Sequence, residues 1–265
     1  MAFQPKLSST LRHLLNKQKI RTLINNPQKV FRKYLLVFED VVGPRISWID
    51  RLAFSMSKER LYRFMDKECS LNDILYTPFN YAGYWVYRSI RPQQIPTEIE
   101  QLAKEIEKLS PSTILEIGTS NGGTLYIWAR YINSCRRIIS IDLPESYPYA
   151  KIKFFKLFDR AKEFYFLRGN SHSKKTVDMF TQVLGQEKIG FLYIDGDHSY
   201  EGVKQDFKTY GQFVARGGIV ALHDIMYHRN YGIDRFWNEI RCQYASKEIV
   251  ASQNQLGYGI GVLYV

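Results

Sequence analysis

The chain has 265 residues, of which 45% are hydrophobic and 24% are charged, a balance that excludes a disordered protein. Its 37 Lys and Arg outnumber its 26 Asp and Glu, so the formal net charge is +11. The three cysteines are far apart and match no disulfide framework or zinc motif, and no apolar run is long enough for a membrane span. We therefore expect a reducing, cytoplasmic location.

The first part of the chain is the most basic. Residues 1–70 hold 14 Lys and Arg against 6 Asp and Glu, and no acidic residue precedes Glu39. Such a stretch is typical of a solvated helical surface, but it also suits an anionic membrane surface, another acidic partner, nucleic acid or an organelle transit peptide. No RNA-binding module is recognisable, so we expect no nucleic-acid partner.

We predict that residues 1–90 form a helical extension. Four leucines fall at helical spacing before the break at residues 25–27, and they are Leu7, Leu11, Leu14 and Leu15. Further apolar segments follow over residues 30–42 and 61–64. The aromatic residues crowded into 76–87 indicate that the extension packs onto a core, although some of them suit a substrate pocket.

A second domain is predicted over residues 91–265. Residues 97–109 form an amphipathic helix with a capping box between Thr97 and Glu100. Short apolar segments then alternate with helical ones. The predicted strands are 113–117, 138–141, 164–167, 190–194, 218–222, 247–251 and 259–264. This alternation predicts an α/β fold, with a doubly wound parallel sheet that is covered on both faces.

The first strand of this domain leads into a glycine-rich turn. The turn has the pattern Gly-x-x-x-Gly-Gly, and Ser120 replaces the second glycine of a dinucleotide fingerprint. Glu116 would repel a phosphate and favour a cationic ligand, so the turn fits S-adenosylmethionine better than NAD or FAD. A simple tight turn with a solvated Glu116 is the alternative. The cofactor residues predicted here are Glu116, Gly118, Thr119, Ser120, Asn121 and Gly122.

Polar residues also follow the next two strands. Asp142 ends the second strand, 24 residues after Gly118, where an acid accepts hydrogen bonds from ribose hydroxyls. Asn170 and Ser171 follow the third strand, where an adenine edge would lie. A helix N-cap is an equally good interpretation of the serines there.

Acids and histidines follow the fourth and fifth strands. Asp195 and Asp224 are placed to hold one divalent cation, such as Mg²⁺, if the two strands are neighbours. His223 would suit manganese, iron or zinc better than magnesium. His198 lies in the turn after Asp195, where a neutral imidazole can accept a hydroxyl proton. Alternatively, His198 caps the next helix.

Three stretches together resemble class I S-adenosylmethionine-dependent methyltransferases, and among them the small-molecule O-methyltransferases of cephalosporin biosynthesis and macrolide sugars. They are residues 114–118, 193–203 and 217–224. The resemblance covers residues 92–265 and implies a Rossmann-like seven-stranded sheet whose last strand is antiparallel. In metal-dependent members the Asp of Asp-Gly-x-His holds the metal and the His is the base, which implies these roles for Asp195 and His198. The family's second acidic site is commonly Glu-Asp or Asp-Asn, whereas here it is His223-Asp224, so the resemblance leaves metal use open.

These observations predict methyl transfer from S-adenosylmethionine to a hydroxyl of a sugar or another polar small metabolite. Asp195 is assigned to the cofactor and metal sites, and Asp195 and His198 to catalysis. The resemblance implies that the N-terminal region shapes the acceptor site and a homo-oligomer. The alternatives are an RNA methyltransferase and a non-catalytic S-adenosylmethionine-binding or membrane-docking protein.

Overall fold

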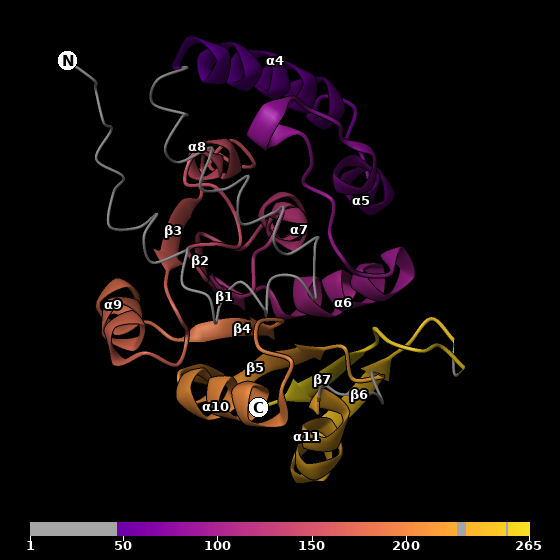
Figure 1. Cartoon of the computed structure of the whole chain (residues 1–265). Helices are drawn as coiled ribbons and strands as arrows, with labels where there is room; N and C mark the ends of the chain where they lie inside the picture. The colour runs from indigo at the N-terminus through magenta and orange to yellow at the C-terminus, as the bar shows by residue number, and fades with distance from the viewer. Residues whose placement is uncertain (1–46, 227–231, 253) are drawn as a thin grey trace, which may run out of the picture. The chain divides into compact units, whose positions relative to one another are not determined.

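A mixed seven-stranded sheet lies at the centre of the fold, in the order β3-β2-β1-β4-β5-β7-β6 (Figure 1). The computed structural model describes residues 47–226, 232–252 and 254–265. The strands are β1 Thr113–Ile117, β2 Arg137–Asp142, β3 Glu163–Arg168, β4 Ile189–Ile194, β5 Val214–His223, β6 Ala245–Ile249 and β7 Ile260–Tyr264. β1 to β5 are parallel, and β7 runs antiparallel between β5 and β6. The predicted fold class and the antiparallel last strand are confirmed.

Helices cover both faces of the sheet (Figure 1). One face carries α6 Pro96–Leu109, α7 Gly123–Tyr131 and α8 Lys151–Phe155, and the other carries α9 Lys174–Leu184, α10 Tyr200–Gly211 and α11 Ile233–Ile240. All five residues of β1 are buried, because each points into one of these two helical layers. Continuous burial explains why the central strands are apolar runs rather than alternating ones. A 3-10 turn, η3 Arg241–Gln243, connects α11 to β6.

The predicted capping box of α6 is wrong. The helix begins one residue earlier than expected, with Pro96 in its first turn and Ile95 as an N-cap that makes no side-chain bond. Proline suits this position because it lacks the N–H that would go unpaired there. Thr97 is therefore inside the helix, and Glu100 instead binds Lys104 at 2.6 Å, one turn further on.

Residues before the sheet pack onto its helical layer through aromatic rings. This region contains α4 Ser47–Met65, α5 Leu71–Asn80 and the 3-10 turn η2 Trp85–Tyr87. The ring centroid of Tyr87 lies 5.4 Å from that of Phe54 in α4 and 5.3 Å from that of Phe154 in α8. Trp48–Val265 form one compact unit, and the domain boundary predicted near residue 90 lies inside it. The helices predicted before residue 47 lie outside the described residues.

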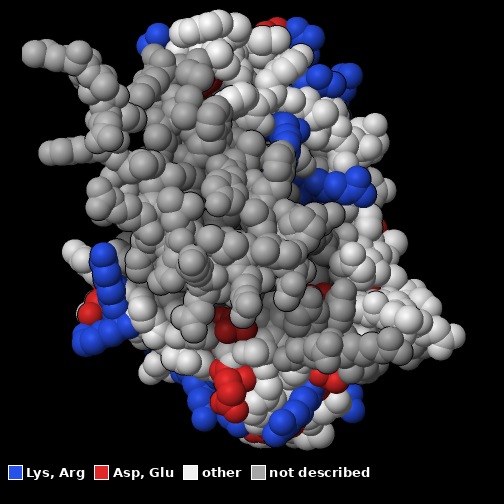
Figure 2. Space-filling view, viewed as in Figure 1, with Lys and Arg blue, Asp and Glu red and all other residues white. Residues whose placement is uncertain are grey.

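Charged side chains of both signs lie on the face shown in Figure 2. Figure 2 shows Lys and Arg in several separate groups on this face, with Asp and Glu between them, and no continuous basic patch on its described part. Among the described helices, none is both long and apolar enough to cross a membrane.

Candidate active site

The candidate site lies at the carboxyl ends of the parallel strands. β1 stands between β2 and β4, so the chain turns to opposite sides of the sheet after β1 and after β4. Such a switch point is where ligands bind in open α/β sheets. The loops after β1, β2, β3, β4 and β5 meet there, and these are the loops that carry the predicted residues.

The loop after β1 packs directly against the turn after β4. Asp195 N–H donates to the Ile117 carbonyl at 2.8 Å. Gly118 has a φ of 95°, and a Cβ at this position would lie 2.1 Å from the carbonyl oxygen of Asp195. Only glycine combines this backbone conformation with so close an approach. The predicted glycine is therefore required for packing the two turns together.

Asp142 holds the glycine turn in shape. Its Oδ2 accepts the backbone N–H groups of Thr119 at 2.9 Å and Ser120 at 2.8 Å. Its Oδ1 accepts the N–H of Leu143 at 2.7 Å and the hydroxyl of Ser146. A carboxylate offers about four lone-pair positions, so these donors occupy its normal capacity. A ribose hydroxyl would have to replace one of them.

Glu116 lies inside the sheet rather than at its tip. It is fully buried, and its Oε1 accepts the Thr124 hydroxyl at 2.5 Å and the indole N–H of Trp128 at 3.2 Å. Its Oε2 has no hydrogen-bond partner among the described residues. Burial raises the pKa of Glu116 to about 8. A buried acceptor atom without a donor fits a cationic group of a ligand, such as the ammonium of S-adenosylmethionine.

The post-β3 segment adjoins this part of the site. Gly169 N–H donates to the Asp142 carbonyl at 2.8 Å, which places Asn170 and Ser171 next to the end of β2. Asn170 is exposed, and its Oδ1 accepts the N–H of His172 at 2.8 Å. The N-cap of α9 is Ser173, not Ser171. The N-cap alternative is therefore confirmed for Ser173, and Ser171 is not the cap.

The acids and histidines after β4 and β5 form one cluster. His198 Nδ1 lies 3.0 Å from Asp224 Oδ2, and His198 Nε2 lies 3.5 Å from Asp195 Oδ1. His223 Nδ1 lies 3.0 Å from Asp195 Oδ1. Single ligand atoms of Asp195, His198 and Asp224 all lie within 4.8 Å of one another, a spacing that fits a divalent cation. The N-cap of α10 is Ser199, so His198 does not cap that helix.

The charges in this cluster stabilise one another. Burial opposes ionisation of Asp195, but His223 and His198 outweigh it and lower its pKa to about 2. Burial also opposes a charge on His198, but Asp195 and Asp224 outweigh it and raise its pKa to about 10. The same two carboxylates raise the pKa of the buried His223. The carboxylates thus favour the protonated form of both histidines, and the histidines favour the ionised form of Asp195.

Two further residues reach the cluster from parts of the chain that the sequence did not single out. Gln94, in the loop before α6, donates through Nε2 to Asp195 Oδ2 at 2.8 Å. Tyr258 lies in the loop between β6 and β7, and its ring centroid is 6.1 Å from that of His223. Both are distant in sequence from the residues they approach, so no local motif could have identified them.

Residues 115–225 match the model of a methyltransferase domain family, Methyltransf_24. This segment contains the glycine turn and every predicted catalytic residue. Residues 115–225 therefore form a methyltransferase domain by sequence.

Solved structures share the methyltransferase fold. An O-methyltransferase from Bacillus cereus, solved with SAH, is 16% identical, with a TM-score of 0.54 over 75% of this chain and 92% of its own. The calicheamicin methyltransferase CalS11 is 17% identical, with a TM-score of 0.50 over 79% of this chain and 91% of its own.

A sequence relative is the uncharacterized protein R132 of Acanthamoeba polyphaga mimivirus, which is 27% identical over 134 residues. The match spans 49% of this chain and 59% of that protein, so it covers little more than half of the relative's length.

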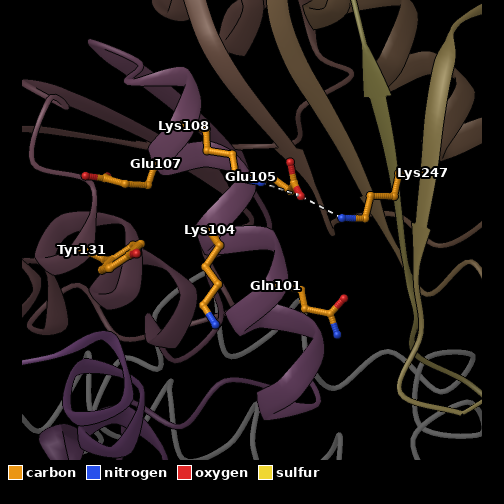
Figure 3. A pocket seen from close by; sticks show the side chains of 7 residues that line it. All are labelled: Gln101, Lys104, Glu105, Glu107, Lys108, Tyr131 and Lys247. Carbon is orange, nitrogen blue, oxygen red and sulfur yellow. Dashed lines mark hydrogen bonds and ion pairs between the residues drawn. The ribbon is translucent and has the colours of Figure 1, made fainter.

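A surface hollow of about 370 Å³ lies elsewhere on the methyltransferase (Figure 3). Its lining comes mainly from α6, with Tyr131 of α7 and Lys247 of β6. Lys247 Nζ lies 2.7 Å from Glu105 Oε1, as the dashed line in Figure 3 shows. The hollow shares no residue with the predicted site. Its Lys247 and Glu105 pair with each other.

Proposed function

We propose that this chain transfers the methyl group of S-adenosylmethionine to a hydroxyl of a small polar acceptor, with a sugar as the favoured class. The observation that carries the proposal is the cluster of Asp195, His198 and Asp224 beside the glycine turn. The sugar class is supported by a neighbour of the same fold, CalS11, which is a TDP-rhamnose 3'-O-methyltransferase and whose apo structure matches with a TM-score of 0.50.

The cofactor residues divide into three roles. Glu116 Oε2 receives the ammonium group, because it is a buried acceptor that lacks a donor. The turn from Gly118 to Gly122 and Asp142 receive the ribose, and Asn170 and Ser171 face the adenine edge. When bound, S-adenosylmethionine supplies a methyl group activated by its sulfonium charge.

His198 takes the proton of the acceptor hydroxyl when its imidazole is neutral, and because the neighbouring acids raise its pKa to about 10, transfer should speed up as the pH rises toward that value. We assign this step to Nε2, because Nδ1 is closer to a carboxylate, at 3.0 Å from Asp224. Gln94 donates to Asp195 and keeps that carboxylate in position beside His198. Removal of the proton by a positioned base typically contributes about 10²- to 10⁴-fold to the rate.

A divalent cation fits the same cluster. Asp195 and Asp224 would hold it, with His198 nearby. Mg²⁺ prefers carboxylate oxygens, whereas Mn²⁺ also accepts an imidazole nitrogen. His223 is in contact with Asp195 through Nδ1 and would support that carboxylate. A bound cation would lower the pKa of the acceptor hydroxyl and orient it.

The proposal is tested by incubating the purified chain with methyl-labelled S-adenosylmethionine and a panel of sugars, nucleotide sugars and phenols. We expect label on a hydroxyl oxygen of at least one acceptor, and loss of transfer in Asp195→Ala. Asp178→Asn is the matched control, since Asp178 is an exposed acid that pairs with Lys174 on α9. Transfer only to RNA would favour the RNA methyltransferase alternative. Binding of S-adenosylmethionine without transfer to any acceptor class would favour the non-catalytic one.

A peripheral membrane contact is a second proposal. Trp48, Leu52 and Met56 follow one another at helical spacing on α4, and all three are exposed. Arg51 and Arg60 are exposed on the same helix, which suits an anionic surface. Flotation with anionic vesicles should recover the wild-type chain and lose Trp48→Ser/Leu52→Ser, whereas neutral vesicles should recover neither. Homo-oligomerisation and a cytoplasmic location stay predictions.

A further inference from the structure

A buried acid lies behind the adenine side of the site, outside the catalytic cluster. Asp206 on α10 is fully buried, and its Oδ1 lies 3.1 Å from Nε2 of His172. His172 belongs to the segment after β3, which also contains Asn170 and Ser171. Burying a carboxylate costs free energy unless partners compensate, so Asp206 would destabilise the fold if it only filled space in the core.

A second side chain of α10 holds the same segment. Tyr210 is one helical turn beyond Asp206, on the same face of the helix. It is also buried, and its hydroxyl donates to the Ser171 carbonyl at 2.7 Å. Asp206 in turn faces His172, one residue after Ser171. The backbone of Ser171 and the side chain of His172 are thus both held by two residues of one helix.

The same acid lies close to the turn after β4. A Cβ built on Gly196 would be 3.7 Å from Oδ2 of Asp206. Gly196 is next to Asp195 and two residues before His198, and α10 begins at the end of this turn, where Ser199 is its N-cap. Asp206 therefore lies between the loop that faces the adenine and the turn that carries the catalytic residues.

We propose that Asp206 and Tyr210 are positioning residues for the adenine site: they hold Ser171 and its neighbours in the orientation that selects adenine over other bases. This inference rests on the proposed function, because it takes Asn170 and Ser171 as the residues that face the adenine edge. Neither side chain touches the cofactor. Both act through the post-β3 segment.

The test compares two ligands that differ only at the base. Calorimetry measures the dissociation constants of S-adenosylhomocysteine and S-inosylhomocysteine, which has an oxygen in place of the adenine amino group. We expect the wild-type chain to prefer the adenine ligand. Losing one positioning contact, to His172 in Asp206→Asn or to the Ser171 carbonyl in Tyr210→Phe, should reduce this preference by about two- to tenfold. Asp178→Asn should keep the wild-type preference.

Three outcomes would overturn the inference. One is an unchanged preference in both variants. Another is an equal loss of affinity for both ligands, which a purely structural role would produce. The third is a wild-type chain that binds both ligands equally well. If Asp206→Asn does not fold, Tyr210→Phe decides alone, since it removes only one hydroxyl. A wild-type chain that binds neither ligand contradicts the proposed function itself, and the inference with it.

Discussion

His198 Nδ1 lies 3.0 Å from Asp224 Oδ2, so the turn after β4 and the end of β5 meet through one imidazole and one carboxylate. β4 and β5 are neighbours in the sheet, which is the condition on which the predicted site depended. Asp224 adopts a φ of 63°, in the left-handed region that non-glycine residues rarely occupy. Such backbone strain is typical of functional sites.

We predict that His198→Ala lowers kcat by about 10²- to 10⁴-fold, because it removes the group that accepts the acceptor's proton. The dissociation constant of S-adenosylhomocysteine should stay within twofold, since the groups proposed to receive the ammonium and the ribose are Glu116 and Asp142 and not His198. Single-turnover transfer and calorimetry measure the two quantities. A His198→Ala chain with the wild-type kcat would rule out His198 as the base.

We predict that Mn²⁺ binds the wild-type chain and that Asp224→Asn weakens this binding at least tenfold. One carboxylate fewer leaves a poorer set of oxygen ligands for the ion. Calorimetry with Mn²⁺ alone measures the effect without any acceptor. Asp197→Asn is the matched control, because Asp197 lies in the same turn and accepts a backbone N–H from Ser199. Equal Mn²⁺ affinity in all three chains would mean that the cluster is not a metal site.

We predict that S-adenosylmethionine binding at pH 7 releases close to one proton. Burial raises the pKa of Glu116 to about 8, so the carboxyl is mostly protonated at pH 7 in the free chain. An ammonium group at Oε2 favours the ionised form and expels the proton. Calorimetry in buffers of different ionisation enthalpy counts the released protons. Glu116→Gln should release none, whereas the exposed control Glu163→Gln should behave as the wild type does.

The raised pKa of Glu116 also affects the stability of the fold. The folded chain holds a proton on Glu116 between about pH 4.5 and pH 8, and the unfolded chain does not. Glu116 therefore makes the unfolding free energy fall as the pH rises through this window. Chemical denaturation of wild type and Glu116→Gln at a series of pH values should show a smaller fall in the variant. Unfolding free energies that depend on pH equally in both chains would contradict the raised pKa of Glu116.

We predict that Glu98→Gln raises the KM for the acceptor about three- to tenfold and leaves cofactor binding unchanged, as expected for the loss of one or two hydrogen bonds. Buried Glu98 accepts the N–H groups of Ala251 at 2.9 Å and Gly259 at 3.0 Å, and so fixes the loop that carries Tyr258. Hydrogen exchange at these two amides should accelerate. Glu100→Gln, on the exposed side of α6, is the control. Unchanged exchange would show that Glu98 does not hold the loop.

The sequence predicted the strands well, because continuous apolar runs between helical segments have few other interpretations. It also predicted the residues after each strand, since parallel strands bring their carboxyl ends to one edge. It did not predict that Glu116 is buried or that Asp142 binds the glycine turn, because both depend on how the next helix and loop pack. The roles of Gln94 and Glu98 were not predicted for another reason. Gln94 lies 101 residues from Asp195 and Glu98 lies 161 residues from Gly259, and no local sequence pattern encodes such distant contacts.

The absence of a side chain at Gly118 has a consequence for the site. At this position the glycine turn and the turn that carries Asp195 approach each other through backbone atoms, because residue 118 has no side chain to separate them. A larger residue there would push the turn after β1 away from the turn after β4. Substitutions elsewhere in the site can therefore accumulate without changing how closely these two turns approach.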